Sequence, residues 1–116
     1  MAYLMGIDLG STSIKAVIYD ENGNTAAFAS RPTEVAHLDP AHPTWAFWEP
    51  DKIWQHTVAV IQEALTKIAD AKQLKGITVT GMGMDGVPID EQGQWLYPFI
   101  SWHCPRTEPQ SRAWSA

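Results

Sequence analysis

The chain has 116 residues, enough for one small domain and not for two. Its hydrophobic fraction of 45% is ordinary for a protein that buries a core, and acidic and basic residues are mixed along the chain to give a net charge of -5. No cluster of Lys and Arg suits a nucleic-acid backbone, so a nucleic-acid partner is not expected. The single cysteine excludes an internal disulfide framework and suits a reducing cytoplasm.

The first residues do not have the pattern of a signal peptide, because a basic leader is missing and Asp8 interrupts the apolar run. No apolar stretch approaches the ~20 residues of a membrane span, so we expect a cytoplasmic protein with no membrane partner. Zinc is not expected either, because the histidines lack metal-ligand spacing with Cys104 and suit solvent-facing positions. These histidines are His37, His42 and His56.

The first third of the chain predicts three strands joined by tight turns. Ile14, Ala16 and Ile18 alternate with less apolar residues, which is typical of a strand with one buried face. Asn22-Gly23 predicts a hairpin turn, because both residues tolerate positive φ. The expected strands are Tyr3 to Asp8, Ser13 to Asp20 and Thr25 to Arg31, with turns at 9–12 and 21–24.

The middle of the chain predicts a loop and then one long helix. Four prolines break any period between Pro32 and Pro50. From Asp51 to about Lys72, apolar residues step by three or four, which predicts an amphipathic helix. The expected apolar stripe is Trp54, Val58, Ile61, Leu65 and Ile68. The six tryptophans of the chain are expected to serve mainly in packing.

The last third predicts a strand over 76–81, a hairpin with strands at 87–90 and 94–100, and the start of a helix at 110–116. The helix has no stop signal, so the chain is expected to be a truncated piece. Three antiparallel strands, a helix and further strands indicate an α/β domain with a mixed sheet. A dinucleotide-binding fold is not expected, because GxGxxG is absent.

The segment from Gly6 to Lys15 is the strongest candidate for chemistry. Asp8 lies at the end of a strand, Gly10 lets the backbone turn sharply, and Ser11, Thr12 and Ser13 follow. Such a turn can direct N–H groups and hydroxyls to phosphate oxygens, while one carboxylate can hold a hydrated Mg²⁺. An ordinary β-hairpin turn is the alternative. The P-loop pattern GxxxxGK[ST] is absent.

Three segments together resemble the FGGY family of carbohydrate kinases, which have the ribonuclease H-like (actin-like ATPase) fold. They are MGIDLGSTSIKAVIYDENGN at the start, TWAFWEPDKIW at 44–54 and ISWHCPRT at 100–107. The resemblance implies that residues 1–116 are the N-terminal portion of the first domain of such a kinase, truncated, with the second domain absent.

The resemblance also implies a reaction, in which two domains close over MgATP and a sugar or polyol, and a substrate hydroxyl takes the γ-phosphoryl group. Asp8 would bind near Mg²⁺, and Gly10, Ser11, Thr12 and Ser13 would approach the transferred phosphate. Lys15 would steady phosphate charge or face solvent. The family's catalytic base lies beyond Ala116, so this fragment is expected to be inactive alone, with no catalytic residue of its own.

Substrate contacts are implied for five residues: Met84, Asp85, Trp102, His103 and Cys104. Met84 stands where glycerol kinases have arginine, and Cys104 stands where the family commonly has aspartate. The run from Gly83 to Thr107 is similar to L-fuculose kinases, which indicates a deoxy-ketose substrate. Whether Cys104 sets specificity or impairs activity stays open, and Arg106 is expected to form a structural ion pair.

Two other functions stay open: another ATPase of the same superfold, and a non-catalytic module that binds no nucleotide. The tryptophan-rich segments at 45–54 and 102–106 favour the kinase over other ATPases. A homodimer also stays open.

Overall fold

The computed structural model describes residues 1–83 and 85–115. It divides into two compact units. We call residues 1–33 and 51–83 the sheet unit, and residues 34–50 and 85–115 the aromatic unit. Met84, an expected substrate contact, and Ala116, at the end of the expected last helix, lie outside the described residues.

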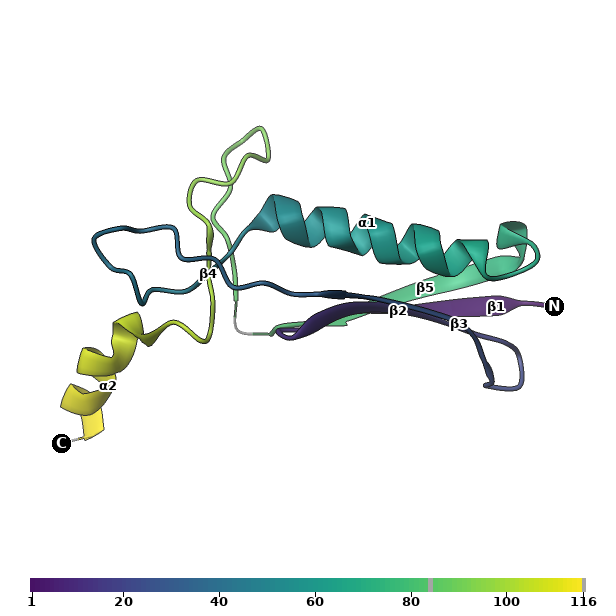
Figure 1. Ribbon diagram of the computed structural model, residues 1–116, viewed down its shortest axis with the longest axis horizontal. Coiled ribbons are helices and arrows are strands. Elements are labelled where there is room, and N and C mark those ends of the chain that lie inside the picture. Colours follow the sequence, from purple (N-terminus) through teal and green to yellow (C-terminus); the bar gives the residue numbers. More distant parts are fainter. Residues whose placement is uncertain (84, 116) are drawn as a thin grey trace. The chain divides into compact units, whose positions relative to one another are not determined.

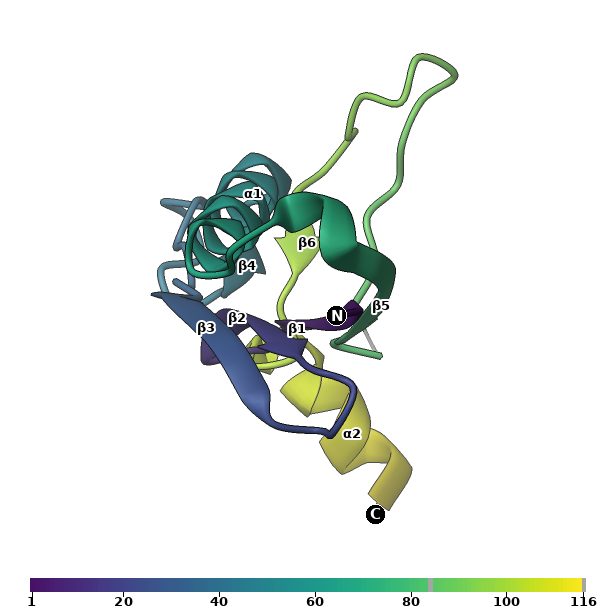
Figure 2. The ribbon, with the colours of Figure 1, turned by 90° about the vertical axis from the view of Figure 1, so that its right-hand side faces the viewer.

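The sheet unit contains a mixed four-stranded sheet with strand order β3-β2-β1-β5 (Figures 1 and 2). β1 pairs antiparallel with β2, β2 pairs antiparallel with β3, and β1 pairs parallel with β5. The strands are β1 (Tyr3–Leu9), β2 (Ser13–Tyr19), β3 (Thr25–Pro32) and β5 (Leu74–Gly81). The three antiparallel strands and the later strand expected from the sequence are thus confirmed.

Both expected turns of this sheet form. The turn between β2 and β3 is held by Asp20, whose carboxylate accepts hydrogen bonds from the backbone N–H groups of Asn22 and Asn24, at 2.9 Å each. Gly23 has φ of +80° in this turn, a backbone conformation that glycine adopts without steric cost. The hairpin signal in the sequence therefore gave the correct turn.

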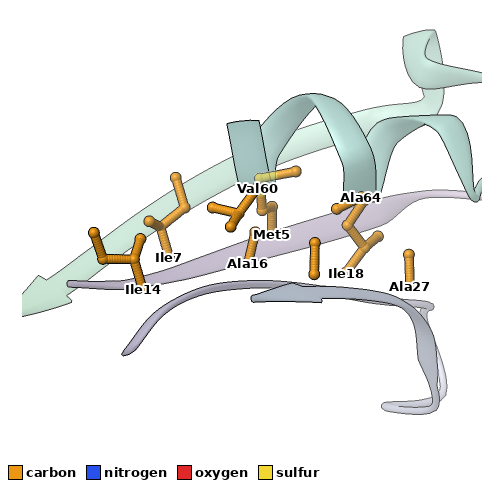
Figure 3. Packing of buried hydrophobic residues seen from close by; sticks show 9 residues of the cluster. Met5, Ile7, Ile14, Ala16, Ile18, Ala27, Val60 and Ala64 are labelled. Atoms are coloured by element: carbon orange, nitrogen blue, oxygen red, sulfur yellow. The ribbon is translucent and has the colours of Figure 1, made fainter. Parts of the chain in front are cut away.

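A helix, α1 (Pro50–Thr66), covers one face of the sheet and closes the core. Alternate strand residues point toward Val60 and Ala64 of α1 (Figure 3). Ile14, Ala16 and Ile18 are all buried, as their alternation predicts. Burying one such isoleucine contributes roughly 1.5–3 kcal/mol. The other buried members of this cluster are Met5, Ile7, Ala27 and Ala29.

The long helix ends at Thr66, not near Lys72 as expected. The Thr66 hydroxyl donates to the Glu63 carbonyl at 2.6 Å, and the Lys67 N–H donates to the Ala64 carbonyl at 3.1 Å, a tightening that is common in a last turn. A short 3₁₀ helix, η1 (Ala71–Gln73), then begins after Asp70, whose carboxylate accepts from the Lys72 N–H at 2.9 Å. Ser/Thr and Asp caps compete with continued helix in this way.

The expected apolar stripe of α1 was wrong at Trp54, which is 67% exposed. The face that meets the sheet carries Ile53, Thr57, Val60 and Ala64, so it is shifted by one residue at the start of the helix. Thr57 is tolerated there because its hydroxyl donates to the Ile53 carbonyl at 2.7 Å.

The aromatic unit has little regular structure. Its sheet is β4 (Phe47–Trp48) paired antiparallel with β6 (Phe99–Ile100), and its helices are η2 (Pro105–Thr107) and α2 (Glu108–Ser115). The segment 32–50, expected to be a loop, therefore contains the short strand β4, which was not predicted because two residues are too few to show an alternating pattern. The helix expected near the end is confirmed as α2 within the described residues.

The hairpin expected over 87–100 forms only its turn. The Asp90 carboxylate accepts from the Gln92 and Gln94 N–H groups at 2.9 Å, and Gly93 has φ of +79°. Beside the turn only an isolated bridge joins Ile89 and Trp95. Most flanking residues are exposed and none is fully buried, so no buried face stabilises longer strands.

The tryptophans do not share one role. Trp48 is fully buried, whereas Trp54, Trp102 and Trp114 are 67%, 55% and 90% exposed. Trp48 is therefore a core residue, whereas these three keep more than half of their surface exposed. In the part of the chain that the structure describes, no helix has the length and apolar character that crossing a bilayer requires.

Candidate functional site

The turn between β1 and β2 is closed by backbone contacts that demand glycine. The Gly10 N–H donates to the Ser13 carbonyl at 3.0 Å. A Cβ atom at Gly10 would come within 2.7 Å of that carbonyl oxygen, a distance that real Cβ atoms essentially never show. The turn is also tied to Thr33, whose hydroxyl donates to the Gly10 carbonyl at 2.7 Å and whose N–H donates to the Thr12 carbonyl at 2.9 Å. The hydroxyl-bearing turn therefore has a fixed shape.

A row of polar residues crosses the sheet beside this turn. Asp8 pairs in register with Lys15 on β2 and with Thr80 on β5, and Lys15 pairs with Ser30 on β3. Registered neighbours share one face of a sheet. Because Met5 and Ile7 face α1, alternation puts Asp8 and its neighbours on the opposite face. The sequence reasoning missed Thr80 and Ser30, since only strand order brings them beside Asp8.

The Asp8 carboxylate is half-buried and forms no ion pair among the described residues, although Lys15 lies opposite it. An ion pair at this position would have left the carboxylate less available to a metal ion. Asp8 thus keeps the accessibility that a phosphate or metal site requires.

The donor set fits a magnesium ion that arrives with phosphate. No group of three or more His, Cys, Asp or Glu residues able to hold a metal occurs in residues 1–83 and 85–115. Magnesium needs only one or two carboxylates when waters and phosphate oxygens complete its shell, and oxygen ligands are the ones it prefers. Asp8 can supply such a carboxylate, so the residues present fit this mode and do not fit a closed protein cage.

In the aromatic unit, Asp85 is held by a buried tryptophan. Trp48 on β4 is 0% exposed, and its indole Nε1–H donates to Oδ2 of Asp85. Asp85 is half-buried and forms no ion pair with any described residue. The carboxylate expected to accept a substrate hydroxyl is therefore oriented by a residue that the sequence reasoning treated as packing.

Trp102 and His103, two other expected substrate contacts, form an aromatic stack. Their ring centroids lie 3.8 Å apart with planes inclined by 29°. His103 also meets the Trp48 ring nearly edge-on, at 5.9 Å and 72°. Trp102 is 55% exposed, so it offers a ring face to solvent or to a ligand.

Cys104 faces Arg106. Its sulfur accepts a hydrogen bond from Nε of Arg106 at 3.1 Å. The guanidinium lies 4.0 Å from the Trp45 ring centroid and 4.8 Å from that of Phe47, distances at which cation–π attraction is effective. Among the described residues Arg106 makes no ion pair with a carboxylate, so the expected ion pair was wrong. The Trp45 and Phe47 rings and the Cys104 sulfur contact it instead.

The Cys104 thiol has a changed acidity. Burial raises its pKa, but the hydrogen bond from Arg106, backbone N–H groups of Ala46 and Arg106, and the Arg106 charge together outweigh burial and hold the pKa below its usual range. The sulfur thus carries part of the acceptor role that a carboxylate would have. The sulfur is thus directed to Arg106 of the same chain. Met84, the remaining expected substrate contact, lies outside the described residues.

Comparisons with known proteins agree on one family. Residues 3–116 match the model of the N-terminal domain of the FGGY family of carbohydrate kinases. The chain is 34% identical to L-fuculokinase of Haemophilus influenzae, over 94% of this chain and 24% of that protein, and 35% identical to glycerol kinase of Acinetobacter baylyi, over 88% and 20%.

A solved structure titled as xylulose kinase from Rhodospirillum rubrum is 33% identical and covers 96% of this chain and 23% of its own, with a TM-score of 0.78. The likeness confirms the expected mixed α/β fold of actin-like sugar kinases. The chain spans about a quarter or less of the relatives it matches. Because the family model matches almost every residue, the chain belongs to the FGGY family of carbohydrate kinases.

Proposed function

We propose that the protein to which this chain belongs is an ATP-dependent carbohydrate kinase of the cytoplasm, and that residues 1–116 form the N-terminal portion of its first domain. One observation carries the proposal: Asp8 presents a half-buried carboxylate without an ion pair among the described residues, beside a turn that only glycine can close. Because the chain belongs to the FGGY family of carbohydrate kinases, we interpret this carboxylate and turn as a site for metal-bound phosphate.

The β1–β2 turn would handle the phosphates. N–H groups and hydroxyls from Gly10 to Ser13 donate to phosphate oxygens, and the Lys15 ammonium on the same face as Asp8 offsets negative charge. Asp8 would hold the hydrated Mg²⁺ that accompanies ATP, and MgATP, when bound, would provide the γ-phosphoryl group for transfer. Thr80 adds a hydroxyl beside Asp8.

The aromatic unit would contact the sugar. Asp85 accepts a hydrogen bond from a substrate hydroxyl, and Trp102 presents an apolar ring face to a carbon face of the sugar. A deoxy-ketose such as L-fuculose is the substrate we favour. The L-fuculokinases among the relatives and the similar run around Cys104 support this choice. Glycerol is less suited, because Met84 offers no charged donor.

The test is an ATP-dependent phosphorylation assay of the intact protein with L-fuculose, L-rhamnulose, D-xylulose and glycerol. We expect L-fuculose to be phosphorylated, and Asp8→Ala to lower kcat by at least about 100-fold. Glu91→Gln, a change of an exposed acidic side chain in the 90–94 turn, serves as the control and should keep the rate. Phosphorylation of another sugar of the panel would correct the substrate alone.

Absence of turnover with every sugar, in a folded protein that also fails to bind MgATP, would favour the second candidate, a non-catalytic module. Residues 1–116 alone are expected to show no turnover, because the family's catalytic base is implied to lie elsewhere in the protein. Robust sugar phosphorylation by these residues alone would contradict that expectation.

A further inference from the structure

The indole nitrogen of Trp48 has one hydrogen-bond partner among the described residues. Trp48 is 0% exposed, and a buried indole N–H needs an acceptor because leaving it unpaired costs about 1–3 kcal/mol. Phenylalanine would fill most of the same space without that requirement. The acceptor is Oδ2 of Asp85, a residue 37 positions later in the chain. A buried donor is thus directed at one oxygen of a half-buried carboxylate.

The second oxygen of Asp85 remains available. The described residues give Oδ1 no hydrogen-bond donor, and no Lys, Arg or His among them pairs with this carboxylate. A carboxylate held at one oxygen by a neutral donor keeps its negative charge and a lone-pair side for a ligand. A substrate hydroxyl is a suitable donor for that side.

The same indole ring supports the aromatic part of the site. His103 meets Trp48 edge-on at 5.9 Å, and Trp102 stacks on His103 at 3.8 Å. The backbone holds this segment in place, because Ser101 donates to the Ala46 carbonyl at 3.1 Å. Trp48 therefore contacts both Asp85, the expected acceptor of a substrate hydroxyl, and His103, on which the exposed Trp102 ring stacks.

We propose that Trp48 is a positioning residue for the sugar, which fixes Asp85 by its indole N–H and supports the Trp102–His103 stack by its ring. The proposal rests on the proposed function. The sugar contacts of Asp85 and Trp102 belong to that function, and the addition is the buried residue that orients Asp85 and supports the stack. Polar groups placed beside an aromatic wall are the usual composition of such sites.

The test separates the indole N–H from the indole ring in the intact protein. Trp48→Phe keeps an aromatic ring and removes the donor. We expect the KM for the sugar to rise on the order of tenfold, as for a lost hydrogen bond to a charged group, while the KM for ATP stays within about twofold. Trp114→Phe, the same change at a tryptophan that is 90% exposed, is the matched control and should change neither.

A double-mutant cycle with Asp85→Ala tests the pairing itself. If Trp48 acts through Asp85, then Trp48→Phe should raise the sugar KM no further in the Asp85→Ala background. The proposal is overturned if the two effects add, if the KM values for sugar and ATP rise together, or if Trp48→Phe lowers only the melting temperature.

A spectroscopic measurement keeps the proposal testable if Trp48→Phe does not fold or if the protein phosphorylates no sugar of the panel. The ¹⁵N-indole resonance of Trp48 should move in Asp85→Ala, and it should move in the unmodified protein on addition of L-fuculose. Movement without phosphorylation of any sugar would refute the proposed function and leave Trp48 as a positioning residue. A resonance that stays still with every sugar of the panel would overturn the inference.

Discussion

The sheet unit and the aromatic unit are stabilised in different ways. The sheet unit buries small aliphatic side chains between a hydrogen-bonded sheet and α1, so its shape follows from strand pairing and from one apolar core. The aromatic unit has two strands of two residues each. Ring contacts hold it instead, among them His42 on Trp45 at 3.8 Å and Arg106 on Trp45 at 4.0 Å.

This difference matches the chemistry proposed for each unit. Phosphate recognition needs backbone N–H groups in a fixed turn, and the sheet supplies that turn with little dependence on individual side chains. Sugar recognition needs particular side chains, and the aromatic unit consists largely of such contacts. Substitutions among the sugar contacts can therefore leave the phosphate turn unchanged, because the sheet and its core hold the turn, whereas aromatic side chains hold the sugar contacts.

The largest stability effect should come from the core of the sheet unit. Ile18→Ala removes a fully buried side chain from β2 and should cost about 3 kcal/mol in the free energy of unfolding, because part of the cavity persists. Ile77→Ala is the matched control: Ile77 on β5 is 57% exposed and should cost less than about 1 kcal/mol. Urea denaturation of both variants measures the difference, and equal losses would contradict this core assignment.

The next effect should come from the phosphate turn. Gly10→Ala forces a Cβ atom against the Ser13 carbonyl and should cost about 2 kcal/mol by overpacking. Gly6→Ala on β1, where a Cβ would meet nothing within 4 Å, is the control and should be tolerated. Thermal denaturation compares the two. If alanine were as well accepted at position 10 as at position 6, the closed turn described above would be wrong.

A smaller effect is expected in the aromatic unit. Arg106→Lys keeps the positive charge but loses the planar group that lies on Trp45 and Phe47, and should cost about 1 kcal/mol. Arg112→Lys, at an exposed arginine of α2 that pairs with Glu108, should change stability by much less. Near-ultraviolet circular dichroism and urea denaturation measure packing and stability together. Indistinguishable variants would show that the aromatic faces do not hold Arg106.

The smallest effect should be a pH dependence at Cys104. Because the folded state holds the pKa of Cys104 below its usual range, the folded state favours the thiolate. The resulting stabilisation is absent at low pH, develops as the pH rises through the lowered pKa, and is complete above the ordinary pKa of a thiol. The melting temperature of the unmodified protein minus that of Cys104→Ser should therefore grow as the pH rises toward the ordinary pKa of a thiol. A difference that stays constant or shrinks would contradict the pairing with Arg106.

The sequence predicted the sheet unit well because its residues carry local signals. Alternation identified the buried face of Ile14, Ala16 and Ile18, and Asn22-Gly23 identified the hairpin. The end of α1 was missed because Asp70 starts a new short helix by a side-chain cap, which local periodicity does not reveal. Thr80 was missed beside Asp8 because parallel pairing joins residues far apart in the chain.

The aromatic unit was predicted less well because its contacts are made by side chains far apart in sequence. Trp48 and Asp85 are separated by 37 positions, and no period relates them. Arg106 meets Trp45 and Cys104 and has no carboxylate partner among the described residues, although its charge favoured an ion pair. The motif resemblance located Trp102 and His103 as candidates, but not the ring of Trp48 that joins them to Asp85.

Titration of the intact protein with ATP, followed by the backbone amide resonances of Gly10 to Ser13, is the most direct test of the phosphate assignment. With Mg²⁺ present, these four amides should shift and saturate, while the amide of Gly93 in the 90–94 turn stays still. Asp8→Ala should abolish the Mg²⁺ dependence. A folded chain whose Gly10–Ser13 amides ignore MgATP, or respond identically without the Asp8 carboxylate, would remove the physical basis of the kinase proposal.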